Sequence, residues 1–596
     1  MALANVAVHL AQSGRRVLLV DFDLEAPGLD TLDLPQPRTP SKGVVDFVQQ
    51  YLASGESPDV SSYLYETEGA GKQGGKLWIM PAGLSDEDYS VRLGAIDWAR
   101  LYSERDGYVL LEDLKAQWKE LLAPDYVLID SRTGHTDVAG ICTRQLPEAV
   151  VVLFIPNEQN RRGLAKAVND IRAEGKRPGG HSIALHFVMS NVPDLDDEEK
   201  ILASRLRAFD AALGIGDDLL TVHRYDSLLL LNQAIFVRDR PRSRLAREYR
   251  AVANEIISQN PEDREGALRF IRSLDEEREH FSPQDLEARL ERMRLLHSRD
   301  AEVLLALANA RRRERRFHEA RALLDDVVAL GNKSPGVLLA RAESRQLTQD
   351  SEGAVQDLSA ALANPEADFP TVDRAVRLLR MISPENLAGL TSRPAVANRS
   401  ASEQLWLATQ LRSRRTELEA SKQLALGVLS REGLSEHEHS MAVGPAAIAL
   451  VALREFGAAR ELLRPLVESV AKPNVQHVFN YAIAEWGETG APPTEGLRRV
   501  VELDVDQKDQ APDANYYQCL ALAAVVIGER ERALDLIARS RTSIRMRPGP
   551  EFSCWRYRLV SPEQFNRDLD AIERLARNGV GEPELLRRGA HTPEPS

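Results

Sequence analysis

Two apolar runs near the start of the chain end in aspartate. The run VLLVDFD ends with Asp21 and Asp23, and the run DYVLID ends with Asp130. A carboxylate at the end of a buried strand is well placed to hold Mg²⁺ through water molecules. A single aspartate of this kind would more simply cap a helix or begin a turn. Two strands ending in this way, within an alternating pattern of strands and helices, favour a nucleotide and metal site.

The segments around these aspartates alternate between short β-branched runs and amphipathic stretches. Strands are predicted at 17–21, 77–80, 126–130, 150–155 and 184–189, and helices at 110–122, 163–173 and 201–213. Apolar strands without polar alternation, separated by helices, indicate an α/β fold with a doubly wound, mostly parallel sheet covered on both faces. The carboxyl ends of such strands meet at one edge of the sheet, so the aspartates are expected to converge there.

The second half of the chain carries an internal repeat instead of strands. Apolar residues return after 34 positions, where Leu304, Ala308, Ala320 and Leu324 are followed by Leu338, Ala342, Ala354 and Leu358. Small residues at this spacing let paired helices approach closely, which is typical of tetratricopeptide-like repeats. An irregular helical domain is the alternative. We therefore expect an α/β nucleotide-binding domain over 1–258, an all-α repeat region over 263–578 and a disordered tail over 579–596.

Bulk composition excludes several classes of function. The net charge of -14 disfavours a general DNA or RNA binder, and the basic run RRRERRF at 311–317 is expected to be a solvated helix face. No run is long and apolar enough for a membrane span, and the amino-terminal residues do not resemble a signal peptide. The three cysteines are scattered and form no ligand motif. We expect a cytoplasmic protein without a membrane anchor.

Four segments of the first half resemble the ParA/MinD class of deviant Walker A ATPases. The opening MALANVAVHLAQSGRRVLLVDFD resembles the helix and strand that follow the phosphate-binding loop of that class. The segment IDSRTGHTDVAGICTRQLP, at 129–147, resembles the Walker B strand and the switch after it. VVVLFIPNEQNRRGL and FVMSNVPD resemble later strands. The similarity covers residues 1 to about 258 and looks closest to modules fused to tetratricopeptide arrays in bacterial regulatory proteins.

The resemblance implies ATP and Mg²⁺ as cofactors and gives the three aspartates separate roles. Asp23 would position the attacking water and help to deprotonate it. Asp130 would hold the hydration shell of Mg²⁺, and Asp21 would support the metal region.

Three further residues would contact the nucleotide if the resemblance holds. Gly134 would lie near the γ-phosphate as part of a switch, Arg132 would contact a phosphate, and Asn191 would hydrogen-bond the base. For Arg132 the alternative is a salt bridge that covers a helix, and for Asn191 it is an ordinary position at the start of a surface loop.

The phosphate loop of the family is expected immediately before Met1, where this sequence has no residues. The glycine-rich stretch GAGKQGGK at 69–76 is not a substitute, because no Ser or Thr follows either lysine and a strand comes next. ATPase activity is therefore expected only with the loop restored. The expected partners are a protein bound by the helical repeats and a second copy of the chain in a nucleotide-dependent homodimer. The alternative is an inactive scaffold or adaptor whose repeats alone bind a partner.

Overall fold

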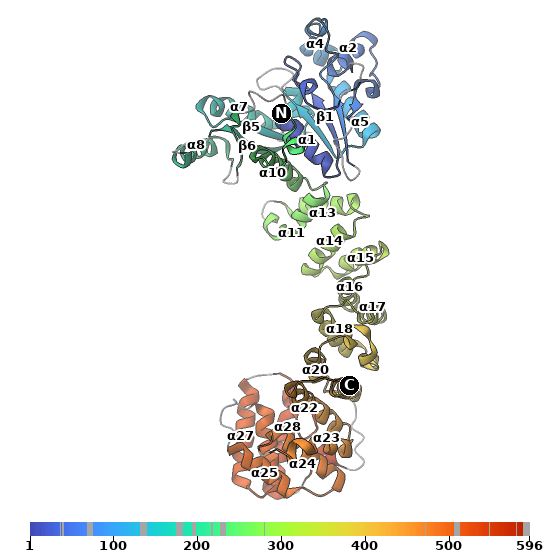
Figure 1. Ribbon diagram of the computed structural model, residues 1–596, viewed down its shortest axis with the longest axis vertical. Coiled ribbons are helices and arrows are strands. Elements are labelled where there is room, and N and C mark those ends of the chain that lie inside the picture. The colour runs from blue at the N-terminus through green and yellow to red at the C-terminus, as the bar shows by residue number, and fades with distance from the viewer. Residues whose placement is uncertain are drawn as a thin grey trace. The chain divides into compact units, whose positions relative to one another are not determined.

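The computed structural model describes residues 1–35, 37, 41–67, 75–131, 140–174, 183–193, 198–215, 219–226, 234–278, 281–470, 472–505, 513–546, 549–579 and 581–587. The chain divides into two compact units, Met1–Leu286 and Glu287–Ser596. The first unit contains two mostly parallel sheets with helices around them, and the second is mostly helical (Figure 1). The predicted fold class is confirmed.

The first sheet has the strand order β2-β3-β1-β4. Its strands are β1 (Arg16–Asp21), β2 (Tyr65–Glu66), β3 (Lys76–Met80) and β4 (Tyr126–Asp130). β1 lies between β3 and β4 and is parallel to both, whereas the short β2 is antiparallel to β3. Three of these strands lie where the sequence predicts them, and β2 was not predicted because two residues leave no periodic signal.

Successive residues of β1 alternate between two hydrophobic cores. Val17 and Leu19 pack with helices α1 (Ala2–Gln12) and α10 (Arg244–Gln259). Leu18 and Val20 pack on the opposite face with α2 (Val44–Ser54) and α5 (Gly107–Leu122). Because neighbouring side chains of a strand point to opposite faces, an unbroken apolar run is what a strand covered on both sides requires.

The turn between α1 and β1 depends on a glycine. Gly14 has a φ of 91°, a left-handed conformation that favours glycine. The amide of Gly14 donates to the carbonyl of Ala11, and the amide of Arg15 donates to that of Leu10. This pattern is a Schellman cap, which ends the helix and sends the chain directly into β1.

The second sheet has the order β5-β6-β7, and all three strands are parallel. They are β5 (Ala149–Phe154), β6 (Ala184–Val192) and β7 (Leu220–His223). One face packs on α7 (Glu158–Glu174) and α8 (Glu198–Leu213), where Phe154 stacks on Phe209 at 4.8 Å between ring centroids. Val188 and Val222 on the other face belong to the same core as α1 and α10. The two sheets therefore share one helical layer.

The outer edges of β4 and β5 have no strand partner among the described residues. The apolar residues of these strands are also incompletely covered: Val127 of β4 is 36% exposed and Leu153 of β5 is 42% exposed. Every residue of β1 after Arg16 is buried. The edge strands β4 and β5 are thus partly exposed among the described residues, whereas the central strand β1 is buried after Arg16.

The remaining helices of the first unit surround these sheets. They are α3 (Tyr89–Gly94), α4 (Trp98–Glu104), α9 (Phe236–Asp239), α11 (Arg264–Arg272) and α12 (Leu274–Glu277), and α13 (Pro283–Leu296) spans the division between the units. The first unit extends beyond the boundary expected at 258–263. Arg15 forms an ion pair of 3.0 Å with Asp263, and the hydroxyl of Tyr126 donates to the same carboxylate at 3.1 Å. These contacts hold Asp263, at the expected boundary, against the α/β core.

The second unit is built mainly from helices, which range from 4 to 17 residues in length. They are α14 (Ala301–Arg313), α15 (Phe317–Ala329), α16 (Pro335–Leu347), α17 (Ser351–Ala363), α18 (Phe369–Ile382), α19 (Pro394–Ala397), α20 (Ala401–Gln410), α21 (Arg415–Leu429), α22 (Glu436–Ala452), α23 (Phe456–Glu468), α24 (Val475–Thr489), α25 (Thr494–Val505), α26 (Ala514–Val526), α27 (Arg530–Met546) and α28 (Pro562–Asn578). A hairpin of β8 (Glu551–Ser553) and β9 (Arg558–Val560) interrupts them. The expectation that strands end with the first half is therefore wrong at this hairpin.

The 34-residue repeat seen in the sequence corresponds to two consecutive helix pairs. α14 and α16 begin 34 residues apart, at 301 and 335, as do α15 and α17, at 317 and 351. All eight repeat residues are buried between helices, namely Leu304, Ala308, Ala320, Leu324, Leu338, Ala342, Ala354 and Leu358. Four of them are alanines, which allow the close helix approach that the spacing predicts.

Four helix pairs share one turn geometry. Arg315, Gln349, Arg454 and Gly528 each stand second after the end of the first helix, and each has a positive φ between 61° and 88°. In each turn the amide of this residue and the amide that follows it donate to carbonyls of the preceding helix. Glycine is the residue that this conformation favours, and only one of the four positions has it.

The basic run at 311–317 is not a simple solvated face. Arg311 is 6% exposed, and its guanidinium contacts Glu287 at 2.5 Å and Glu314 at 3.1 Å. Arg316 contacts Glu287 at 2.7 Å. The expectation is wrong for Arg311, because acidic residues from the preceding helix and the turn surround it. The run neutralises carboxylates of its own unit.

Part of the segment expected to form a disordered tail is packed, at residues 583–586. Leu585 and Leu586 are buried in the core of the last helices. The amide of Leu585 donates to the carbonyl of Trp555, and Arg454 donates to the carbonyl of Leu585 at 2.6 Å. In the sequence, two adjacent leucines among polar residues indicate that this segment packs against the fold.

In the described part of the chain, no helix has the length and apolar character needed to cross a bilayer.

Candidate functional site

The aspartates predicted from the sequence lie together at the carboxyl ends of β1 and β4. Asp21 and Asp130 are register partners on adjacent parallel strands, and the amide of Phe22 donates to the carbonyl of Asp130 at 2.9 Å. Asp21 has the same parity along β1 as Val17 and Leu19, which pack against α1. The carboxylates of Asp21 and Asp130 therefore lie on the α1 face of the sheet.

Asp21 organises the loop that follows β1. One carboxylate oxygen accepts from the amide of Asp23 at 3.1 Å. The other accepts from the amides of Gly28 at 3.2 Å and Leu29 at 3.1 Å. Asp21 is 1% exposed, so its charge is compensated by these amides instead of water. The loop DLEAPG is folded around this carboxylate, and both oxygens are engaged in holding it.

The site is electrostatically strained because carboxylates gather in a desolvated place. Burial raises the pKa of Asp21 to about 6 against the lowering effect of its backbone hydrogen bonds, and the charge of Asp130 adds to the rise. Burial also raises the pKa of Asp130, and the charge of Asp23 adds to that rise. A divalent cation at this place would relieve the mutual repulsion of the three carboxylates.

Asp23 differs from Asp21 in having an unused oxygen. Its Oδ1 atom is buried and has no hydrogen-bond partner among the described residues. A buried carboxylate oxygen without a partner is costly unless a ligand or water satisfies it. Asp130 is partly exposed. These two carboxylates can accept hydrogen bonds from a water molecule or from a hydrated cation, whereas both oxygens of Asp21 already accept from loop amides.

The amino end of α1 is the positive partner of this acidic cluster. The amino end of α1 lies within electrostatic range of the carboxylate of Asp130. α1 has no side-chain cap and no acidic residue in its first turn. The amide groups at a helix amino terminus carry partial positive charge and are suited to anions. Acids at the strand ends thus lie beside helix amides that carry partial positive charge.

Two residues beside the cluster were missed by the sequence reasoning. The hydroxyl of Tyr89 donates to the carbonyl of Leu24 at 2.8 Å, and burial followed by the charge of Asp21 raises the tyrosine pKa. Asp46 accepts from the amides of Gly43 and Leu84, which joins the start of α2 to the loop after β3. The capping pattern of Gly43 with Asp46 three residues later was the available signal.

Asn191 lies at the end of β6, separate in the chain from the aspartates. Its φ is 54°, the pairing of β6 with β7 is irregular between Met189 and Val192, and its side chain is exposed. Asparagine tolerates a left-handed conformation better than most residues, which accounts for its type at a bulge. Contact between Asn191 and a base stays a prediction.

Arg132 and Gly134 lie outside the described residues, as does most of the glycine-rich stretch at 69–76. Within the described residues, no group of three or more His, Cys, Asp or Glu side chains could hold a metal ion by itself. A cation at the strand ends would therefore need oxygen ligands from water or from a bound phosphate. Mg²⁺ commonly binds in this manner, through one or two carboxylates together with substrate phosphates.

The chain matches no protein-family model and no curated protein. Two solved structures of McdA from Cyanothece are similar to part of it. A variant of McdA in complex with ATP has 14% sequence identity and a TM-score of 0.32, and covers 43% of this chain and 90% of its own. Apo McdA has 14% identity and a TM-score of 0.33, and covers 43% of this chain and 93% of its own. Similarity at this level does not assign a function.

Proposed function

We propose that the first unit is a nucleotide-dependent switch of the ParA/MinD type and that the helical unit couples it to a protein partner. The observation that carries the proposal is the meeting of Asp21, Asp23 and Asp130 at the amino end of α1. Carboxylates at the ends of parallel strands, beside a helix amino terminus, suit Mg²⁺ bound to a nucleoside triphosphate. ATP would supply the transferable phosphoryl group, and its hydrolysis would reset the switch.

Each aspartate has a distinct task in this proposal. Asp21 shapes the loop by holding the amides of Asp23, Gly28 and Leu29. This fixes the backbone of Asp23, whose buried Oδ1 is free to orient a water molecule and accept its proton. Asp130 accepts hydrogen bonds from water around the cation. Asp21 is thus a positioning residue, and its contribution to the metal region acts through the loop.

The unpaired edges of β4 and β5 could both pair with one further strand. Both edges belong to parallel strands, and Val127 and Leu153 on them remain exposed. A strand paired with both would join the two sheets into one and would end beside the aspartates. A glycine-rich loop from the end of that strand to the start of α1 would complete the phosphate site. The proposed ATPase activity requires this strand and loop.

We further propose that the helical pairs form a tetratricopeptide-like array that binds a protein partner in a bacterial regulatory role. The recurrence of helix pairs at 34 residues and their common turn support this class of repeat. In the same proposal ATP joins two copies of the chain, and hydrolysis separates them. The acidic balance of the chain speaks against DNA as the partner.

An inactive scaffold remains the second candidate function, and one observation favours it. Both oxygens of Asp21 are committed to loop amides, so the acidic cluster already has a structural purpose. In that case the first unit would only support the helical unit, and the repeats would bind the partner without nucleotide.

The decisive experiment compares two forms of the purified protein, the chain of 596 residues and the chain extended by a strand and glycine-rich loop encoded in frame ahead of Met1. Binding of a fluorescent ATP analogue and release of phosphate are measured with Mg²⁺ and with EDTA. We expect the extended form to bind and hydrolyse ATP only with Mg²⁺, and to dimerise with a non-hydrolysable analogue in light scattering. Absence of binding by both forms would refute the ATPase proposal and leave the scaffold as the candidate function.

Substitutions then separate the tasks of the aspartates in the extended form. Asp23→Ala should abolish hydrolysis and preserve nucleotide binding, because the residue acts on water. The matched control is Glu56→Ala, an exposed acid at the end of α2 that should change neither quantity. Hydrolysis by the Asp23→Ala variant at the unaltered rate would refute the role of Asp23.

A further inference from the structure

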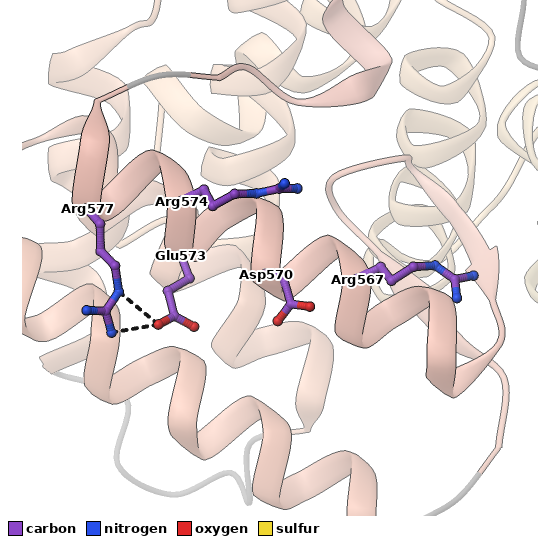
Figure 2. A pocket seen from close by; sticks show the side chains of 5 residues that line it. All are labelled: Arg567, Asp570, Glu573, Arg574 and Arg577. Atoms are coloured by element: carbon purple, nitrogen blue, oxygen red, sulfur yellow. Dashed lines mark hydrogen bonds and ion pairs between the residues drawn. The ribbon is translucent and has the colours of Figure 1, made fainter.

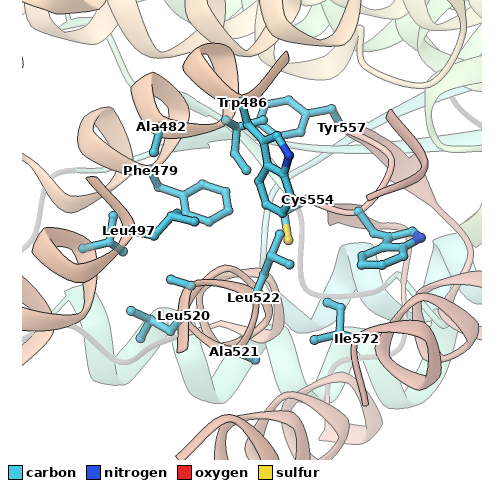
Figure 3. Close-up of a cluster of buried hydrophobic side chains, with 14 of the residues drawn as sticks. Phe479, Ala482, Trp486, Leu497, Leu520, Ala521, Leu522, Cys554, Tyr557 and Ile572 are labelled. Atoms are coloured by element: carbon cyan, nitrogen blue, oxygen red, sulfur yellow. The ribbon is translucent and has the colours of Figure 1, made fainter. Parts of the chain in front are cut away.

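A cavity of about 320 Å³ lies inside the helical unit, remote from the acidic cluster in the chain. It is formed by residues of α22, α24, α25 and α26, by the segment before α21, and by the hairpin β8–β9. Figure 3 shows the hydrophobic cluster beside it, to which α24 contributes Phe479, α26 contributes Leu520 and the hairpin contributes Tyr557. The volume lies within the usual range for sites that bind small molecules.

Arg412 is the unusual member of the cavity wall. Its Nε is buried and has no hydrogen-bond partner among the described residues. Burial lowers its pKa to about 10, and no neighbouring group opposes that effect. The backbone of Arg412 is fixed, because its carbonyl accepts from the amide of Leu559 at 2.9 Å. A cation in a desolvated wall that forms no ion pair with the described residues is costly, and an anionic ligand would reduce the cost.

Other buried arginines of the unit show what Arg412 lacks. Arg341 contacts Asp357 at 2.6 Å and Asp325 at 3.1 Å. Arg556 contacts Asp568 at 2.9 Å. Both of these guanidinium groups are matched by carboxylates of the chain itself. Arg412 is the one in the cavity wall, where a ligand can reach it.

The remaining lining limits what that ligand can be. Phe479, Leu520 and Phe552 offer apolar surface, and Gln476 and Asn515 offer amide groups. Asp513 and Glu551 also line the cavity, and burial followed by the charge of Asp513 raises the pKa of Glu551. Two acids in the same wall repel a ligand with several negative charges, such as a phosphate ester or a dicarboxylate.

We propose that this cavity binds a small organic monocarboxylate with an apolar body, whose carboxylate pairs with the guanidinium of Arg412. A planar guanidinium offers two parallel N–H donors that match a carboxylate, so the pair can be bidentate. The apolar body lies against the aromatic and leucine side chains of the wall. Occupation of the cavity ties the hairpin to α24 and α26 and stabilises the helical unit.

The hollow on α28 carries no comparable proposal. Arg567, Asp570, Glu573, Arg574 and Arg577 line it, and Figure 2 shows all of them on one face of the helix. Arg577 donates to Glu573 at 2.7 Å, and Arg541 contacts both acids, Asp570 at 2.5 Å and Glu573 at 2.9 Å. The acids there are already paired.

The cavity can be tested on the full chain with 4-phenylbutyrate as the probe. Cys519 lines the cavity and is partly exposed, whereas Cys142 and Cys554 are buried, so iodoacetamide should label Cys519 first. We expect 4-phenylbutyrate to slow this labelling and to bind in calorimetry. The neutral 4-phenylbutyramide and the doubly charged phenylsuccinate should bind at least tenfold more weakly. Equal binding of the acid and its amide would overturn the proposal without any substitution.

Arg412→Gln tests the same contact from the protein side. We expect at least a tenfold loss of affinity for 4-phenylbutyrate with an unchanged circular dichroism spectrum. Arg567→Gln, on the surface hollow of α28, is the matched control and should bind as the unaltered chain does. If Arg412→Gln fails to fold, the comparison of acid, amide and diacid on the unaltered chain still decides the question. Retained affinity in a folded Arg412→Gln variant would contradict the proposal.

Discussion

Two buried acids, one in each unit of this protein, have opposite kinds of partner. In the helical unit, Asp357 lies between Arg341 and Arg345, at 2.6 Å and 2.9 Å. In the α/β unit, Asp21 and Asp130 lie side by side on adjacent strands, and backbone amides are the partners of Asp21. The first arrangement neutralises charge within the fold. The second leaves negative charge concentrated at one place.

The difference between these two arrangements indicates where each unit could bind a ligand. A neutralised pair such as that of Asp357 contributes to folding and offers nothing to a bound molecule. Burial and the charge of Asp130 raise the pKa of Asp21, and burial and the charge of Asp23 raise that of Asp130. A cation would stabilise these carboxylates. In the helical unit the buried charge without an ion-pair partner is positive, and Arg412 carries it. Unbalanced buried charge, rather than charge as such, marks the candidate sites.

The largest expected effect comes from breaking a balanced pair. Asp357→Asn should lower the free energy of unfolding of the helical unit by about 3 kcal/mol or more, because two guanidinium groups lose their buried partner. Urea denaturation of the full chain, followed by hydrogen exchange in α16 and α17, measures the change. Asp535→Asn, which removes an exposed partner of Arg539, is the control and should leave stability unaltered. Equal losses of stability from the two substitutions would show that the buried pair stabilises the fold no more than an exposed pair does.

The next effect in size tests the unbalanced acids through pH. The pKa of Asp21 is about 6 in the folded chain and 3.8 in its ordinary state. Between these values the folded state retains a proton that the unfolded state has released, so stability falls as the pH rises from about 4 to about 6. The shift corresponds to about 3 kcal/mol. Burial raises the pKa of Asp130 as well, which adds to the same slope.

Asp21→Asn should remove most of this dependence on pH. Hydrogen exchange of α1 and β1, corrected for intrinsic rates, measures local stability at pH 4 and pH 7 in the full chain. Asp59→Asn is a suitable control, since hydrogen bonds from Ser61 lower the pKa of Asp59 and give the opposite sign. Identical slopes for the unaltered chain and Asp21→Asn would show that the charge of Asp21 costs the fold nothing.

The sequence predicted the strands of the first unit well because they are buried on both faces. An unbroken apolar run such as VLLV has one simple interpretation, and the aspartate after it must lie at the sheet edge. The convergence of Asp21 and Asp130 followed from strand direction alone. Their electrostatics did not, since the pKa of Asp21 depends on burial and on amides of a loop with no periodic pattern.

The cavity around Arg412 could not have been predicted from local patterns. Its wall combines residues from about 410 to 560, and the hairpin that closes it consists of two strands of three residues. Segments this short leave no periodic signal. An arginine also looks the same in sequence whether a carboxylate faces it or not. The 34-residue period, by contrast, gave the helix pairs because a small buried residue recurs at fixed positions.

A smaller effect is expected from the turns that the helix pairs share. Gln349 is exposed and has a φ of 65°, whereas Gly528 fills the equivalent position of another pair. Gln349→Gly should stabilise its pair, and Gly528→Ala should destabilise its own, each by about 1 kcal/mol. Thermal unfolding of the full chain and hydrogen exchange in the affected helices measure both. A loss of stability in Gln349→Gly would mean that the turn is held by its side chain and not by backbone geometry.

The smallest effect concerns the open edge of β5 and distinguishes it from the enclosed strand β1. Leu153 is 42% exposed, so Leu153→Lys should change the free energy of unfolding by less than about 0.5 kcal/mol. It should also reduce self-association in sedimentation velocity, because a charged residue protects an unpaired edge. Leu18→Ala, in the buried strand, is the comparison and should lower the free energy of unfolding by about 3 kcal/mol.

In the form extended by a strand ahead of α1, Leu153 would be covered, and the same lysine substitution should lower stability. A lysine that is tolerated equally in both forms would show that the added strand does not occupy this edge.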